Sequence, residues 1–253
     1  SSTSAAIAAM ARAQENWNSP QEPFRIFGNT YYVGTAGLSA ILITSDAGHI
    51  LIDGALPQSA PLIEANIRAL GFQPRDVRLI LNSHEHFDHA GGLLRADGEK
   101  AFPHATIVAQ KAEWEIALGD NPRLVASYVQ PELELVKAWG TQGNADGEKE
   151  LIPGVSVVPT GGHSSGHQAI IAKGTGDDAK TLVFLGDLFM RPWSANPRWV
   201  SAFDDFPLDS VAQKAELFAQ AVDEDWLIVL SHERTHPIGR IERDRDRYRY
   251  VPI

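Results

Sequence analysis

The sequence contains no cysteine, and this absence excludes several kinds of site. Disulfides, cysteine nucleophiles, thiolate zinc sites and iron–sulfur clusters all need cysteine. Any metal ion must therefore be bound by histidine and carboxylate side chains. The chain offers 9 histidines and 32 acidic residues for that purpose.

The sequence also lacks long apolar runs and an excess of positive charge. No run approaches the ~18 apolar residues that a membrane-spanning helix needs. The formal net charge is -10 and the isoelectric point is about 5.3, which opposes binding to nucleic acid or to an anionic membrane surface. We therefore expect a small-molecule substrate as the partner, with neither nucleic acid nor membrane, and the oligomeric state stays open.

The remaining composition is that of an ordinary globular protein. Of the 253 residues, 43% are hydrophobic and 21% are charged, which predicts one folded domain over residues 1–253. The chain begins Ser1-Ser2-Thr3 without a methionine, as a processed chain would. We therefore expect a periplasmic or secreted protein, with the cytoplasm as the alternative.

The stretch NSHEHFDHAGG, residues 82–92, is the strongest local signal. It places three of the nine histidines within six consecutive positions. In an extended segment side chains alternate between faces, so His84 and His86 project to the same side and can bind one ion. Asp88 and His89 are adjacent and are placed for a second ion beside the first. This motif arises by chance in roughly fewer than one chain in a thousand.

The rest of the chain predicts a layered α/β fold. Apolar runs between turn residues predict strands, and longer runs with helical spacing predict helices. The predicted strands are 24–27, 30–33, 39–44, 49–52, 77–81, 106–109, 155–159, 168–172, 181–185 and 226–230. The predicted helices are 4–17, 59–70, 111–118 and 208–222, and 122–139 is mostly helical. Strands interleaved with helices in both halves predict an αββα sandwich, two packed sheets with helices outside.

Two segments carry no such pattern. Residues 142–150 are glycine-rich and charged and are interpreted as a surface loop. The tail RIERDRDRYRY has mixed charges and is interpreted as a solvated edge.

Three more candidate ligands each directly follow a predicted apolar strand. They are His163 in PTGGHSSGH, Asp187 in FLGDLF and His232 in VLSHE. Because three strands deliver one polar side chain apiece to the same edge, we expect these residues to join the histidine motif.

Other histidines and two tryptophans receive weaker interpretations. His167 is expected to be a hydrogen-bonded loop residue, with a role behind the ligands as the alternative, and His236 is a less favoured substitute for His232. His49 and His104 are expected at the surface or in turns. Trp193 and Trp199 either wall a substrate cleft or anchor their loop on the core.

The motif SHEHFDHAGG and the later His, Asp and His resemble the metallo-β-lactamase superfamily of binuclear zinc hydrolases, across nearly the whole chain. The resemblance implies the αββα fold and two Zn²⁺ ions. It places His84, His86 and His163 on the first ion. Asp88, His89 and His232 would hold the second, with Asp187 as a bridging carboxylate. His86 stands where di-iron members carry an acidic residue, which favours zinc.

The resemblance points to two substrate classes. Residues 24–58 and 70–92 are most similar to the third subclass of true metallo-β-lactamases, and from about Leu93 the chain is more similar to broader hydrolases of the superfamily. Asp187 stands where that subclass usually has serine and where lactonases and glyoxalase-type thioesterases have aspartate. After Asp187, however, the chain lacks the tyrosine usual in homoserine lactonases.

We therefore expect hydrolysis of a cyclic amide, most of all a β-lactam, with a lactonase or an ester or thioester hydrolase as the alternative. In this hypothesis the two ions share a hydroxide that attacks the carbonyl. Asp88 is the predicted catalytic residue, because its free oxygen can orient the hydroxide and relay a proton. A non-catalytic metal-binding member of the fold is disfavoured by the complete set of seven ligands.

Overall fold

The computed structural model describes residues 17–253 except positions 96, 123, 125, 141, 177, 178 and 246. The helix predicted over residues 4–17 lies outside these residues apart from Trp17.

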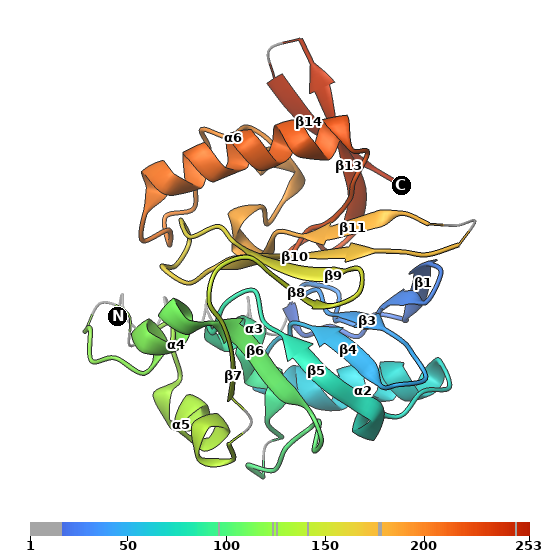
Figure 1. Ribbon diagram of the computed structural model, residues 1–253, viewed down its shortest axis with the longest axis vertical. Coiled ribbons are helices and arrows are strands. Elements are labelled where there is room, and N and C mark those ends of the chain that lie inside the picture. Colours follow the sequence, from blue (N-terminus) through green and yellow to red (C-terminus); the bar gives the residue numbers. More distant parts are fainter. Residues whose placement is uncertain are drawn as a thin grey trace, which may run out of the picture.

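Two seven-stranded sheets face each other, and helices cover their outer sides (Figure 1). The first sheet has the order β1 (Phe24–Phe27), β2 (Thr30–Tyr32), β3 (Ile41–Ile43), β4 (His49–Ile52), β5 (Val77–Leu81), β6 (Thr106–Gln110) and β7 (Gln142–Ala145). The second has the order β14 (Arg247–Pro252), β13 (Ile238–Asp244), β12 (Leu227–Val229), β11 (Thr181–Phe184), β10 (Gln168–Lys173), β9 (Val155–Pro159) and β8 (Lys149–Ile152). The predicted αββα sandwich is confirmed.

The three longest described helices follow the amphipathic pattern of their sequences. The α-helices of the described residues are α2 (Ala60–Ala69), α3 (Phe87–Ala90), α4 (Lys111–Ala117), α5 (Gln130–Ala138) and α6 (Pro207–Asp223). Apolar side chains of α2, α4 and α5 pack on the outer face of the first sheet. Leu217 and Phe218 of α6 pack on the outer face of the second. Between the sheets lies a third apolar layer that includes Ile52, Leu81 and Phe184.

Strand directions explain why polar residues meet at one rim. Strands β1 to β4 form the predicted antiparallel meander, and β4, β5, β6 and β7 run parallel. In the second sheet β11 and β12 are parallel, and β9 has the same direction because both β9 and β11 are antiparallel to β10. The residues that follow β9, β11 and β12 therefore leave the sheet at the same edge.

Two predictions about the fold were wrong, and a third segment forms strands that were not predicted. Residues 142–150 are mainly strand, because β7 and β8 are outermost strands bonded on one side only, where glycine and charge are tolerated. The charged tail is a solvated sheet edge as predicted, since β14 is an outermost strand with no fully buried residue, but the hairpin β13–β14 itself was not predicted. In it Tyr248 packs towards Phe218 and Tyr250 towards Phe189. Of the described residues in 122–139, those before Gln130 form turns rather than helix.

No helix in the part of the chain that the structure describes is both long and apolar enough to span a membrane.

Candidate metal centre

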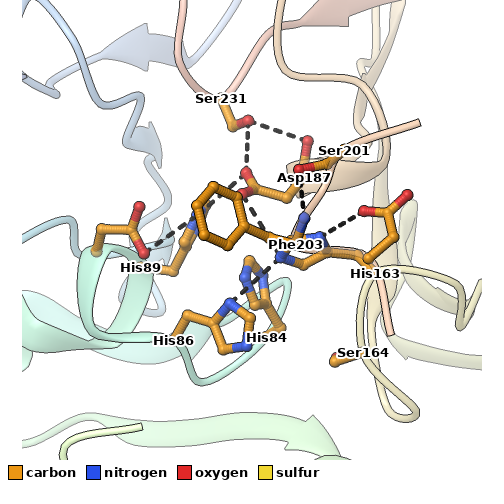
Figure 2. Close-up of polar contacts among 12 residues, drawn as sticks. His84, His86, His89, His163, Ser164, Asp187, Ser201, Phe203 and Ser231 are labelled. Carbon is orange, nitrogen blue, oxygen red and sulfur yellow. Dashed lines mark hydrogen bonds and ion pairs between the residues drawn. The ribbon is translucent and has the colours of Figure 1, made fainter. Parts of the chain in front are cut away.

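The seven predicted ligands lie together between the ends of the two sheets, and all seven are buried. Figure 2 labels His84, His86, His89, His163 and Asp187 among them. The first sheet supplies those that follow β5, and the second supplies the rest from the segments after β9, β11 and β12. The seven are His84, His86, Asp88, His89, His163, Asp187 and His232.

One set of three comprises His84, His86 and His163. Each offers one nitrogen, and these atoms lie within 4.8 Å of one another. His86 Nδ1 faces His163 Nε2 at 3.2 Å, and the ring centroids of His84 and His86 are 4.4 Å apart. This set joins the two sheets, because His163 alone comes from the second.

The other set comprises Asp88, His89 and His232, again with donor atoms within 4.8 Å. Asp88 lies 3.9 Å from His89 Nε2 through Oδ1 and 3.7 Å from His232 Nε2 through Oδ2. Asp88 and His89 come from α3, directly after the first set's loop. The two sets are therefore adjacent, as predicted from the spacing of the motif.

Asp187 lies between the two sets. Its Oδ1 is 3.2 Å from His89 Nε2 and 2.9 Å from His232 Nε2, and its Oδ2 is 3.6 Å from His163 Nε2. Ser231 Oγ donates to Asp187 Oδ1 at 2.8 Å and fixes the carboxylate. One carboxylate thus contacts histidines of both sets.

Two buried carboxylates orient the histidines from behind. Asp53 accepts from His89 Nδ1 at 2.6 Å, and Asp204 contacts His163 Nδ1 at 2.9 Å. When Nδ1–H is donated outwards, the lone pair of Nε2 points into the cluster, which is the tautomer a metal ligand needs. Asp53 also accepts from Ser83 N and Ser83 Oγ.

The electrostatics of the cluster favour bound positive charge. Burial lowers the pKa of His84 and of His86 well below the usual range, and neighbouring histidines add to this. Burial also lowers the pKa of His89, but the carboxylates of Asp187, Asp88 and Asp53 raise it well above the usual range. Burial alone would raise the pKa of Asp187, but His232 and His89 hold it well below its usual range.

The donor atoms fit a divalent cation. His84 Nε2 and His86 Nε2 are buried and have no hydrogen-bond partner among the described residues. A buried polar atom without a partner is costly unless something else satisfies it. Neutral imidazoles with carboxylates, and no thiolate, form a donor set typical of zinc in hydrolytic sites.

Several residues that support the cluster were not predicted. Asp53 follows β4 just as the candidate ligands follow their strands, so the same strand-end rule could have found it. Asp204 lies in an irregular loop, and Trp17 packs on the His232 ring with the ring centroids 5.2 Å apart. No local sequence pattern marks either residue as part of the site.

The remaining histidines occupy different surroundings. His167 is buried, contacts Thr160 Oγ1 and accepts from Asp187 N at 3.2 Å, so this hydrogen-bonded loop residue also holds Asp187. His236 is exposed and outside the cluster. His49 was predicted at the surface but is buried in β4, where its ring packs on Phe72 at 5.1 Å. His104 is exposed in a turn as predicted.

Trp193 and Trp199 do not line the metal cluster. They are 63% and 53% exposed and border a groove of about 830 Å³ with α6 and β14. None of the seven candidate ligands lines this groove. Lys214 of α6 fixes the loop that carries both tryptophans, because its Nζ donates to the carbonyl oxygens of Ser194 at 2.9 Å and Trp199 at 2.6 Å.

Lys214 predicts a pH dependence of stability. Burial lowers its pKa from 10.5 to about 8, against a raising effect of Asp204. Between pH 8 and 10.5 the unfolded chain therefore binds more protons than the folded protein. Burying the charged lysine destabilises the folded protein fully below pH 8, and this destabilisation disappears as the pH rises towards 10.5. The gain in unfolding free energy is about 3 kcal/mol at most. Urea unfolding at pH 7.5 and 9.5 should show this increase in unfolding free energy for the wild type but not for Lys214→Met. An equal change with pH in both proteins would contradict the effect assigned to Lys214.

Comparison with known proteins agrees with this geometry. The model of the metallo-beta-lactamase superfamily matches residues 34–232. An N-acyl homoserine lactonase of Bacillus thuringiensis is 30% identical over 152 residues, which cover 51% of this chain and 55% of that protein. The chain thus spans about half the length of such lactonases.

Two solved structures have the same fold. MEM-A1, a subclass B3 metallo-beta-lactamase isolated from a soil metagenome library, is 32% identical with a TM-score of 0.61, covering 85% of this chain and 81% of that one. The dizinc quorum-quenching lactonase AidC, in complex with a product, has a TM-score of 0.78 over 93% and 98% of the two chains. Its 16% identity shows the fold alone. With a family model that covers most of its length, the chain belongs to the metallo-beta-lactamase superfamily.

Proposed function

We propose that this protein is a hydrolase that uses two Zn²⁺ ions. His84, His86 and His163 bind the first, Asp88, His89 and His232 bind the second, and Asp187 bridges them. The observation that carries the proposal is the position of Asp187. Its Oδ1 faces His89 and His232, and its Oδ2 lies between His232 at 3.2 Å and His163 at 3.6 Å, so the carboxylate reaches both sets.

When bound, such a pair of ions activates a water molecule as a nucleophile and polarises the carbonyl that it attacks. The protein's own contribution is to position the reacting groups. Asp88 faces the second set with both oxygens, Oδ1 at 3.9 Å from His89 Nε2 and Oδ2 at 3.7 Å from His232 Nε2. With one oxygen on the second ion, the other would orient the nucleophile and relay a proton to the leaving group. Ser231 and His167 keep Asp187 in place meanwhile.

Two substrate classes remain candidates. The 32% identity to a subclass B3 metallo-beta-lactamase over 85% of the chain supports a β-lactam. An aspartate at position 187, together with the similarity to N-acyl homoserine lactonases, supports a lactone or another ester. Both reactions attack a carbonyl in a ring and need the same machinery.

A substrate panel with defined metal content tests the proposal. We expect chelation to remove turnover and Zn²⁺ to restore it. A chromogenic β-lactam, a series of lactones and a thioester then separate the substrate classes, because turnover of one class at a kcat/KM of about 10⁴ M⁻¹s⁻¹ or more identifies it. Full activity after complete removal of metal, or no turnover of any member of the panel by the zinc-loaded protein, would refute the proposal.

Phe203 predicts a preference among substrates of either class. Its side chain is 73% exposed, and Figure 2 shows its ring in front of the histidines. The next residue, Asp204, is tied to His163, and Phe203 N donates to Ser201 Oγ at 3.1 Å. Phe203→Ala should lower kcat/KM roughly tenfold for substrates with long apolar arms and little for short arms. Trp193→Ala is the control. Equal losses of kcat/KM for long-arm and short-arm substrates in Phe203→Ala would count against a role of Phe203 in substrate preference.

A further inference from the structure

Glu113 connects three segments that surround the first set of candidate ligands. It lies on α4 and is fully buried. Its Oε1 accepts from Glu85 N and from Tyr128 Oη, both at 2.9 Å. Its Oε2 accepts from Ser164 Oγ at 2.6 Å and from Gly166 N at 3.2 Å. Both oxygens thus have two donors each.

Three of these four donors are next to a candidate ligand. Glu85 lies between His84 and His86 in the chain, so its N–H fixes the backbone from which both histidines project. The Tyr128 ring packs edge-on against the His86 ring at 4.7 Å. Ser164 directly follows His163. All three ligands of the first set are therefore positioned through one carboxylate.

The contact also spans the sandwich. The loop of His84 and His86 follows β5 of the first sheet, whereas the loop of His163 follows β9 of the second. Glycine at position 166 permits the approach, because a Cβ there would lie 2.1 Å from Glu113 N. Glu113 contacts no member of the second set, whose His89 is held by Asp53. Asp53 also bonds Ser83, which precedes His84.

We propose that Glu113 is a positioning residue that holds His84, His86 and His163 in register for the first metal ion and has no comparable effect on the second. This inference rests on the proposed function. A carboxylate suits the role because it accepts all four donors at once. The amide of glutamine cannot, since its NH₂ group would face Glu85 N–H or Gly166 N–H, and neither backbone group can turn round.

The test is zinc affinity rather than activity. Metal-free wild type and Glu113→Gln are titrated with Zn²⁺ against a chelator of known affinity, which resolves the binding steps. We expect Glu113→Gln to weaken one step about 10- to 100-fold and to leave the other unchanged. Ser164→Ala, which removes a single donor, should weaken the same step by a smaller factor and serves if Glu113→Gln does not fold.

Two controls separate positioning from general destabilisation. Glu64 is also buried and bonds Arg68 and Arg95, but it contacts none of the ligand loops. Glu64→Gln should therefore lower the melting temperature and change neither binding step. In a His86→Ala background, where the first set is already broken, Glu113→Gln should not weaken the remaining step further.

The outcomes distinguish the two proposals. If wild type binds no zinc, the proposed function fails and this inference fails with it. If wild type binds zinc but Glu113→Gln weakens neither step, weakens both equally, or weakens the step that remains in His86→Ala, only the inference on Glu113 is overturned.

Discussion

Replacing His163 by alanine is expected to lower kcat/KM by about a thousandfold or more and to remove one equivalent of bound metal. His163 is the only member of the first set that comes from the second sheet, and its Nε2 lies near both His86 Nδ1 and Asp187 Oδ2. Without it the first ion would keep only His84, His86 and the shared carboxylate of Asp187 as ligands. Metal analysis and steady-state kinetics on the same preparation give both quantities.

The matched control is His236→Ala. His236 is exposed and lies four positions after His232, but it is outside the cluster. This variant should keep wild-type metal content and activity. Full activity of His163→Ala, or an equal loss in His236→Ala, would be incompatible with the proposed site.

Replacing Asp53 by alanine should have the second largest effect, and on stability as well as on metal binding. Asp53 is fully buried and accepts three hydrogen bonds, two from Ser83 and one from His89. Its removal takes this acceptor away from three buried donors, of which Ser83 Oγ still contacts His84 Nδ1, and we expect a loss of about 3–5 kcal/mol in unfolding free energy. Urea unfolding of the metal-free protein measures this loss.

Asp53→Asn separates the two effects of that residue. The backbone of Asp53 has a φ of 54°, a conformation that asparagine adopts readily. The variant keeps the shape but cannot accept all three bonds, so metal binding by the second set should weaken about 10- to 100-fold while much of the stability is retained. Unchanged metal binding in both variants would show that Asp53 does not orient His89.

The clustering of the seven candidate ligands could be predicted from the sequence because their signals are local. The spacing of His84, His86, Asp88 and His89 is set within one loop, and each later ligand directly follows an apolar strand. Strand periodicity then places those ends at one rim. The αββα sandwich could be predicted for the same reason, since the alternating patterns of strands and helices are also local.

The supporting residues could not be predicted, because their roles depend on contacts between distant segments. Asp204 and His163 are 41 positions apart, and Glu113 and Ser164 are 51 apart. Nothing in a single sequence distinguishes such a carboxylate from an exposed one. The missed strands have a similar cause, because their pairing is decided by neighbouring strands and not by their own weak patterns: β7, β8 and β14 are outermost, and β13 pairs with β12 and β14.

Anomalous diffraction from zinc-loaded crystals tests the central claim most directly. Two peaks should appear about 3.5–4 Å apart, one among His84, His86 and His163 and the other among Asp88, His89 and His232, with Asp187 between them. A peak in neither position, or zinc bound only outside these seven side chains, would contradict the account.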